Sequence, residues 1–360
     1  METQIGGVAV APPLEPEAKI MARLPIEAHV AASRIDSWSR GWLFSPAIDL
    51  LFLCNLPWLL ALAPLVVDVS SLPRVEFWQI YFLTTPHRWL TLLLVANDPV
   101  RRGTRSRQFV LLAVVCLAVV LLARWKTGGF ACLALVDYLW NAWHFGSQHA
   151  GILRIYSRRA GGKLKLRGET WGVRILVAYT SLRLASWLTG WTEAIPSAAM
   201  VLKILDHLIL VIPLALVLQE VIHFQPARLG AVVYLCSVSL LYGCLLWSVA
   251  HGIAALVLSL TVAASAFHAV EYLALVSFYA GQRRTQGPSG VFRKLTMAWG
   301  ALILIYIVAL GCMGYLLASA WFDVWIGLNL WAAFLHYAYD GMIWKLRVPA
   351  TATIMGTATP

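Results

Sequence analysis

Long runs of apolar residues, separated by short polar segments, follow one another along almost the whole chain. Each run has about 20 residues, the length that an α-helix needs to cross a hydrocarbon core of roughly 30 Å. The pattern predicts an all-α fold, a polytopic transmembrane helix bundle with about ten spans. We place these spans near residues 47–67, 75–97, 108–125, 130–154, 172–191, 197–220, 229–249, 253–280, 296–319 and 322–345.

The apolar stretch from Leu229 to Gly281 is the one part of this pattern without a charged loop between spans. It is too long for a single membrane-crossing helix, because about 20 residues suffice for one span. We therefore divide it near His251 and Gly252.

The basic residues gather in short clusters between the apolar runs, and these clusters alternate between rich and poor loops. Of the 28 Lys and Arg residues, 22 fall on the side of both termini and only three on the other side. Because Lys and Arg are retained in cytoplasmic loops, this bias predicts that both termini are cytoplasmic, in a bacterial cytoplasmic (inner) membrane. Residues 1–46 are then a cytoplasmic lead-in without the apolar core of a signal peptide, 47–345 the transmembrane domain and 346–360 a disordered tail.

Composition excludes an ordinary soluble protein. The chain is 60% hydrophobic and 12% charged, with a mean hydropathy of +0.73, whereas soluble domains have about 25% charged residues. The net charge of +11 would suggest a nucleic-acid partner in a soluble protein. Here the charge lies in loops that orient spans, so we expect the lipid bilayer as partner and no nucleic acid.

The histidines carry the candidate chemistry, because ionisable groups inside a bilayer are rare and mark functional sites. Six of the nine lie within predicted spans, all on even-numbered ones: His87, His144, His149, His207, His268 and His336. Counting at 1.5 Å per residue to the next basic residue places four of them, on four different spans, roughly 14 to 22 Å from the cytoplasmic boundary. These imidazoles can therefore meet in one layer.

Two acidic residues share a helix face with these histidines. Glu271 lies three positions after His268, and Asp340 lies four positions after His336, and both spacings bring side chains together on a helix. Arg88 is a buried cation that needs a carboxylate partner, either Glu271 or Asp340.

Several imidazoles and a carboxylate that project inward from separate helices form a ligand set for iron, zinc or copper. We prefer iron, as one or two ions, because a His-rich set with a carboxylate inside lipid suits non-haem iron that activates oxygen. The predicted metal ligands are His87, His144, His149, His268, His336 and Asp340. For His207 a packing role competes with membership of the site, because Lys203 and Asp206 lie next to it.

Three strings, TTPHRWLTLLLVANDPVRR, WHFGSQHAGILRIYSRR and LHYAYDGMIWKLR, resemble segments of uncharacterised bacterial polytopic membrane proteins. The WHFG string also looks like a histidine box of the membrane-embedded carotenoid-cleaving dioxygenases of the bacteriorhodopsin-related-protein type. That weaker resemblance implies iron held by histidines of several spans. The HxxxH and HxxHH boxes of membrane fatty-acid desaturases and hydroxylases are absent from the sequence.

The first functional hypothesis is an oxygen-dependent iron oxidoreductase of the membrane. Its partners would be a hydrophobic, lipid-like small molecule and molecular oxygen. Glu271 would act as ligand or proton acceptor, and Arg88 and Tyr337 would orient ligands or bind a polar part of the substrate.

Two other hypotheses use the same residues. A proton-coupled transporter would arrange the His, Asp and Glu side chains as a relay across the membrane. A haem protein for electron transfer would use two facing histidines and leave the others without a role.

Overall fold

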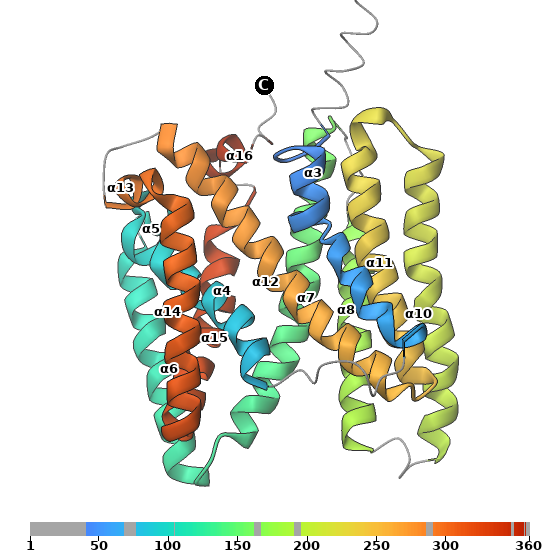
Figure 1. Cartoon of the computed structure of the whole chain (residues 1–360), viewed down its shortest axis with the longest axis horizontal. Coiled ribbons are helices and arrows are strands. Elements are labelled where there is room, and N and C mark those ends of the chain that lie inside the picture. The colour runs from blue at the N-terminus through green and yellow to red at the C-terminus, as the bar shows by residue number, and fades with distance from the viewer. Residues whose placement is uncertain are drawn as a thin grey trace, which may run out of the picture.

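The computed structural model describes residues 41–67, 77–103, 105–161, 167–190, 196–285, 291–346, 349–355 and 357, and all of its regular secondary structure is helical. Successive long helices run in alternate directions (Figure 1). The described start of the chain and its last helix lie at the same end of the molecule (Figure 1). The all-α prediction is therefore confirmed.

The chain begins with a bent unit of three short helices: α3 (Pro46–Ile48), the π-helix η1 (Asp49–Leu53) and the 3-10 helix η2 (Leu56–Leu65). The long helices are α4 (Phe77–Asn97), α6 (Ser106–Thr127), α7 (Ala131–Arg159), α8 (Arg167–Thr189), α10 (Pro196–Ile222), α11 (Leu229–Ala250), α12 (Ala254–Thr285), α14 (Trp299–Ala320) and α15 (Phe322–Ile343). Short helices complete the fold: α5 (Pro99–Arg102), η4 (Pro226–Arg228), α13 (Val291–Met297) and α16 (Pro349–Ile354).

Five of the described helices are long and apolar enough to cross a membrane, namely Ser106–Thr127, Ser197–Ile222, Pro226–Ala250, Ala254–Arg284 and Trp299–Ala320. A sixth crossing results if the pair Pro46–Leu53 and Leu56–Leu65, bent by 49°, spans as one unit. These helices indicate a multi-pass membrane protein. The remaining long helices α4, α7, α8 and α15 do not reach the same apolarity, and three of them carry the polar residues of the candidate site.

The long apolar stretch is divided where the sequence predicted. Helix α11 ends at Ala250 and α12 begins at Ala254. Gly252 between them has φ +66, a left-handed conformation that glycine adopts without a steric penalty. The turn therefore needs no charged loop.

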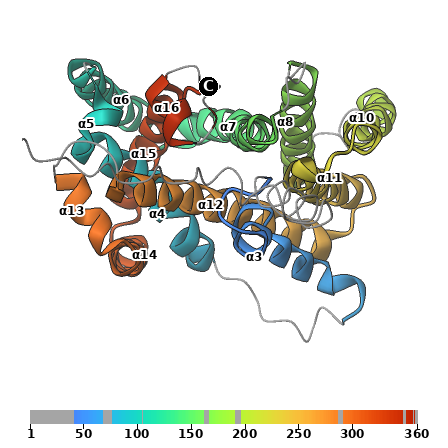
Figure 2. The ribbon, with the colours of Figure 1, turned by 90° about the horizontal axis from the view of Figure 1, so that it is seen from above.

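Helix α12 forms the centre of the bundle. It crosses the molecule obliquely, with η2, α11 and α4 packed against it, and viewed from above it lies between α7 and α14 (Figures 1 and 2). Its side chains Leu260, Phe267 and Val276 are fully buried. At the periphery, only 11%, 11% and 6% of the residues in the most apolar stretches of α6, α10 and α14 are buried. Their apolar side chains therefore face outward, as expected for helices that are exposed to lipid.

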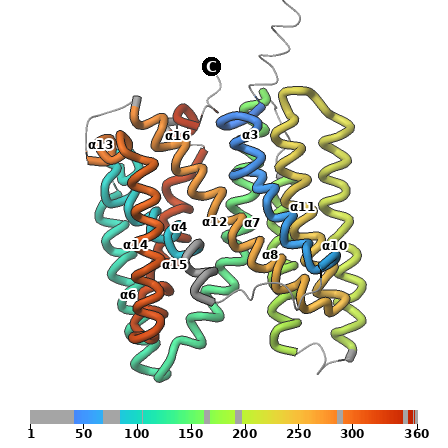
Figure 3. Tube along the Cα trace, in the orientation of Figure 1, coloured from blue at the N-terminus to red at the C-terminus, as the bar shows by residue number. Residues whose placement is uncertain are grey.

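The C-terminal tail differs from the disordered segment that the sequence suggested. Residues 349–354 form α16, which packs against α12 (Figure 3). Met355 is fully buried, and Arg101 donates to Thr351 Oγ1 at 3.0 Å. The buried side chain of Met355 and the hydrogen bond to Thr351 thus hold this segment against the bundle, although its composition alone does not predict a helix. Residues 1–40 of the predicted lead-in lie outside the described residues.

Candidate metal centre

Four histidines from four helices meet near the middle of the bundle. His87 of α4 lies 4.9 Å from His268 of α12 and 4.9 Å from His336 of α15, measured between ring centroids. His144 of α7 lies 5.1 Å from His268 and 4.6 Å from His336. All four are buried. We refer to them as the four-histidine cluster.

Two overlapping groups within this cluster could hold a metal ion: His87, His268 and His336, and His144, His336 and Asp340. Within each group the candidate ligand atoms all lie within 4.8 Å of one another. Two imidazole nitrogens on opposite sides of one ion are about 4.2 Å apart, twice a metal–nitrogen bond of roughly 2.1 Å. Small side-chain shifts would therefore bring either group into coordination distance.

The cluster contains ring nitrogens that have no hydrogen-bond partner among the described residues. These buried atoms are Nδ1 of His87, Nε2 of His144, both nitrogens of His268 and Nε2 of His336. A buried polar atom without a partner destabilises a fold by about 1–3 kcal/mol. Several such atoms side by side fit a site whose partner is an ion, because each has a lone pair or proton that protein groups leave unused.

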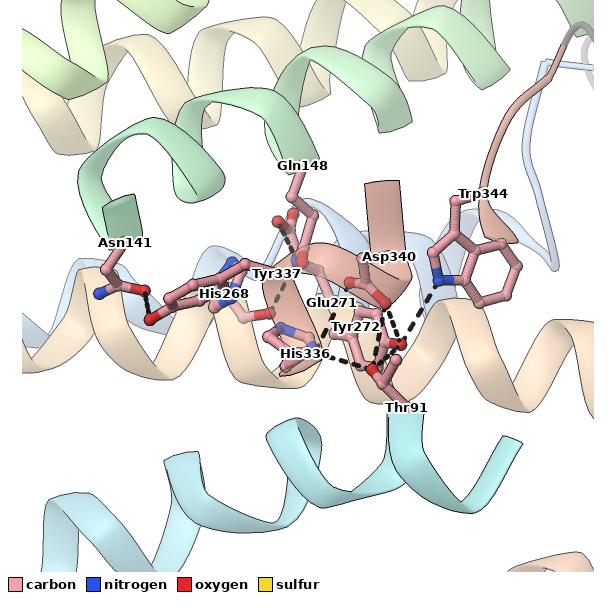
Figure 4. Close-up of polar contacts among 10 residues, drawn as sticks. All are labelled: Thr91, Asn141, Gln148, His268, Glu271, Tyr272, His336, Tyr337, Asp340 and Trp344. Atoms are coloured by element: carbon pink, nitrogen blue, oxygen red, sulfur yellow. Dashed lines mark hydrogen bonds and ion pairs between the residues drawn. The ribbon is translucent and has the colours of Figure 1, made fainter. Parts of the chain in front are cut away.

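The orientation of His336 is fixed by Thr91 of α4 (Figure 4). Its Nδ1 lies 2.7 Å from Thr91 Oγ1, which in turn donates to Asp340 Oδ1 at 3.1 Å. A hydroxyl has one hydrogen, so when Thr91 donates to the carboxylate it must accept from Nδ1–H of His336. This tautomer leaves the lone pair of Nε2 directed away from Thr91 and available to a metal.

Tyr272 completes this network. Its hydroxyl donates to Asp340 Oδ1 at 2.8 Å and lies 2.5 Å from Thr91 Oγ1. Trp344 Nε1 donates to the same hydroxyl at 3.4 Å. The carboxylate of Asp340 is therefore held by two hydroxyl groups on two different helices (Figure 4).

Each helix of the cluster supplies a polar side chain four positions after its histidine. The pairs are His87 and Thr91, His144 and Gln148, His268 and Tyr272, and His336 and Asp340. Residues four apart on a helix share a face, and the second member lies about 6 Å further along each axis. Sequence reasoning used only the Asp340 pair and missed Thr91 and Tyr272, although the same spacing pointed to both.

His149 and Glu271 form a separate buried group. His149 Nδ1 lies 3.0 Å from Glu271 Oε1 and 2.9 Å from the hydroxyl of Tyr234, and Nε2 lies 3.4 Å from the hydroxyl of Tyr242. Gln148 donates to Glu271 Oε1 at 2.8 Å. Both imidazole nitrogens of His149 thus contact oxygen atoms, and the structure does not bring this residue into the four-histidine cluster.

The other predicted site residues border the cluster. The ring of Tyr337 lies 4.8 Å from that of His144, and its hydroxyl donates to Asp137 and Asn141 at 2.9 and 3.0 Å. Arg88 is half-buried on α4, directly after His87. The carboxylates of Glu271 and Asp340, its expected partners, accept hydrogen bonds from other side chains.

His207 lies outside the site. It is exposed on α10, where Nδ1 lies 2.7 Å from the carbonyl oxygen of Lys203. Its neighbour Asp206 instead binds Arg183 of α8 through two hydrogen bonds of 2.8 and 2.9 Å. This ion pair gives Arg183 a partner that the sequence did not identify.

A cavity of about 650 Å³ adjoins the cluster. His144 is the member of the cluster that lines it, together with Asp340, Tyr337 and Gln148. Trp140 and Trp143 form part of its wall and are 41% and 43% exposed, so the cavity is bordered by side chains that also meet the surroundings of the protein. A molecule in this cavity would lie next to His144 and Asp340.

No family model, curated protein or solved structure matches this chain.

Proposed function

We propose that this protein is a ten-span membrane metalloenzyme that binds iron at the four-histidine cluster and Asp340 and uses molecular oxygen to oxidise a hydrophobic, lipid-like molecule. The observation that supports it most directly is the group of buried imidazole nitrogens that have no hydrogen-bond partner within the described part of the chain. Histidines that merely pack in a membrane protein bond to neighbouring side chains, as His149 does. Four converging imidazoles with unused nitrogens instead match a metal site in a helical bundle.

The donor set favours iron among the metals that bind imidazole. Imidazole suits zinc, copper and iron alike, whereas a carboxylate oxygen such as that of Asp340 is a hard ligand that is less suited to Cu(I). Bound iron would supply oxidation by oxygen, chemistry that zinc lacks. The partly open cavity beside His144 supports a reaction with a small molecule rather than a purely structural ion.

The surrounding residues would hold the ligands and exchange protons. Thr91 and Asp340 keep His336 in the tautomer that presents Nε2. Gln148 lines the cavity and donates to Glu271, so Glu271, the expected proton acceptor, is one side chain removed from a bound molecule. Tyr337 and Arg88 would restrict how a substrate approaches His144.

The proposed ten-span topology is supported by the agreement between the positions of the helices and the distribution of the basic residues. Each predicted span coincides with a helical unit, and the basic clusters lie at alternate ends of these units. The helices that are too polar to qualify by composition include α4, α7 and α15, whose polar residues face one another around the site. Inward-facing polar groups are tolerated inside a bilayer when other helices shield them from lipid.

A proton-coupled transporter is the alternative function. It needs ionisable groups spread across both leaflets, whereas the four histidines contact one another in one layer with ring centroids 4.6–6.4 Å apart. The His149–Glu271 pair extends the polar region only to the neighbouring tyrosines.

Metal content decides between these functions. The protein would be purified in detergent without chelators, and its metals would be measured by mass spectrometry in the wild type, His144→Ala and His336→Ala. We expect about one or two equivalents of iron in the wild type and a loss in both variants. His207→Ala, which removes an exposed histidine, is the control and should retain the wild-type content.

His149→Ala separates the two buried histidine environments. The metal should remain in this variant, because both nitrogens of His149 contact other side chains. Metal-free wild-type protein would remove the enzyme proposal and make the transporter the leading function. An absorption band of a porphyrin in the purified protein would point to haem instead.

A further inference from the structure

The cavity beside His144 has a polar end and an aromatic wall. Its volume of about 650 Å³ falls in the range of roughly 300–1,000 Å³ that is usual for small-molecule sites. Apolar and aromatic surface comes mainly from Trp140, Trp143, Trp344 and Leu275. Such a lining accepts an apolar chain or ring system.

Three cations also line the cavity: Arg154, Arg174 and Lys345. Asp340, at the metal centre, is the only acidic residue among the described residues of the lining. Nε of Arg154 is buried without a hydrogen-bond partner among the described residues. The cavity thus has an excess of positive charge and at least one buried donor that no described residue satisfies.

These cations differ from other arginines at the same end of the molecule. Arg101 and Arg158 donate to the backbone carbonyls of Ile343 and Leu346, and further arginines there pair with carboxylates. Arg154 and Arg174 line the same cavity, where like charges repel each other. Arg174 makes a long hydrogen bond of 3.3 Å to Ser147 and lies over the rings of Trp143 and Trp171. Lysine and arginine are expected in cytoplasmic loops, but orientation of spans does not require like charges to converge on one cavity. A bound anion would relieve the repulsion.

We propose that the cavity binds an anionic amphiphile, with its carboxylate or phosphate group at Arg154 and Lys345, within the positive field to which Arg174 adds, and its apolar chain directed toward His144 and Asp340. The head position follows from the cavity alone, and only the reaction along the chain rests on the proposed metalloenzyme. Ten residues separate Arg154 from His144 on α7, or about 15 Å along the helix. The reacting atom would therefore lie well down the chain from the charged head.

Binding to the protein in nanodiscs of phosphatidylcholine tests this inference. The probe is tritiated hexadecanoate, with hexadecan-1-ol, acetate and inorganic phosphate as competitors. We expect saturable binding of hexadecanoate at one site and competition by the alcohol that is at least about tenfold weaker, because a charge-assisted hydrogen bond is lost. Acetate and inorganic phosphate should compete poorly, since neither has an apolar chain.

Two variants locate the probe in the cavity. Arg154→Gln combined with Arg174→Gln should weaken hexadecanoate binding by about tenfold or more. Arg284→Gln, which removes an exposed cation outside the cavity lining, should leave binding unchanged.

A second pair of variants blocks the cavity without altering charge. Gly151 lines it, and an added Cβ there meets no atom within 4 Å, so Gly151→Leu should fill space and reduce binding while the protein still folds. Gly281, equally open but outside the cavity lining, provides the control Gly281→Leu.

The outcomes distinguish this inference from the proposed function. Equal competition by acetate or inorganic phosphate would assign the cations to a soluble anion and overturn the amphiphile. Equal binding of hexadecan-1-ol, or unchanged binding in both Gly151→Leu and the double arginine variant, would also overturn it. Metal content measured on the same samples reports on the metalloenzyme separately, so a metal-free protein that still binds hexadecanoate would retain the amphiphile site and lose the enzyme.

Discussion

Thr91 occupies a position at which one hydroxyl connects three helices. Its Oγ1 contacts His336 of α15, Tyr272 of α12 and Asp340 of α15 while the residue itself belongs to α4. Groups that hydrogen-bond a ligating imidazole fix its tautomer and ring orientation and raise its basicity. The hydroxyl would therefore support a metal bound at the cluster without being a ligand.

We predict that Thr91→Val weakens metal affinity by about 10–100-fold, the usual effect of removing a group that supports a ligand. Valine preserves the shape of the side chain but can neither accept from His336 Nδ1 nor donate to Asp340. Competition with a chelator, followed by metal analysis, measures the change. Thr180→Val is the matched control, because Thr180 is fully buried on α8 and its hydroxyl has no hydrogen-bond partner among the described residues. Equal affinity in Thr91→Val and wild type would exclude this role.

At the scale of elements, α7 is held in place by its close approach to α8. Gly146 lies between His144 and Gln148 in the sequence, and a Cβ added there would lie 2.9 Å from Cα of Arg174 and 3.2 Å from its carbonyl oxygen. Small residues allow transmembrane helices to pack with their backbones in contact. The position of His144 thus depends on a glycine two residues later.

Gly146→Ala should lower the thermal stability of the detergent-solubilised protein and its metal content, because the added methyl group pushes α7 and α8 apart. Gly151→Ala, on the same helix with no atom within 4 Å of an added Cβ, is expected to be neutral or slightly stabilising. Apparent melting temperature and metal content report the two effects. A Gly146→Ala protein with wild-type values of both would show that the helix pair adjusts without affecting the site.

Helices α8 and α10 are joined by the ion pair between Arg183 and Asp206, whose side chains are 11% and 5% exposed. Removal of one partner leaves the other buried and uncompensated, a change that typically destabilises by about 3–5 kcal/mol. We predict that Asp206→Asn clearly lowers the melting temperature. Asp323→Asn, which breaks the exposed pair with Arg124, should change it little, since exposed pairs contribute about 0–1 kcal/mol. Similar effects of both substitutions would contradict the importance of the buried pair.

At the scale of the whole molecule, the alternation of basic clusters predicts which end faces the cytoplasm. Helix α6 tests this assignment, because Ser106 and Lys126 lie near its opposite ends and are both exposed. In a background without the six native cysteines, Lys126→Cys should react with a membrane-impermeant maleimide in intact spheroplasts. Ser106→Cys should react only after lysis. The reverse labelling pattern would invert the topology and place the cationic end of the cavity in the outer leaflet.

Much of the helical order could be predicted because apolar length and charge alternation are local properties of the chain. The break between α11 and α12 at Gly252 is an example, since only a glycine turn could interrupt so long an apolar run. The apolar runs also predicted α7 and α15, but these helices are less apolar than the five candidate spans because their inward faces carry His144, Asp340 and other polar groups. In these helices the polar residues face protein rather than lipid, and amino-acid composition does not show which way a side chain points.

The sequence predicted how deep the candidate site lies in the bundle, but it did not identify all of the residues that form it. Helical rise placed His87, His144, His268 and His336 in one layer, and the structure brings these four together. His149, which the sequence also suggested as a ligand, instead faces Glu271, Tyr234 and Tyr242. Because each residue turns a helix by about 100°, side chains five positions apart point to different faces of the helix. The direction in which a side chain points therefore decides its neighbours.

The sequence by itself determined the all-α class, the apolar helices, the direction of the charge bias and the helices that bear histidine, because each depends on residue types at short spacing. Tertiary structure alone decided which nitrogens are without partners, that Thr91 and Tyr272 hold Asp340, and that Arg154 and Arg174 line the cavity next to His144. These features depend on how helices distant in the chain rotate and approach one another. That rotation is fixed by packing contacts such as Gly146 against Arg174, in which atoms far apart in sequence must fit the same space.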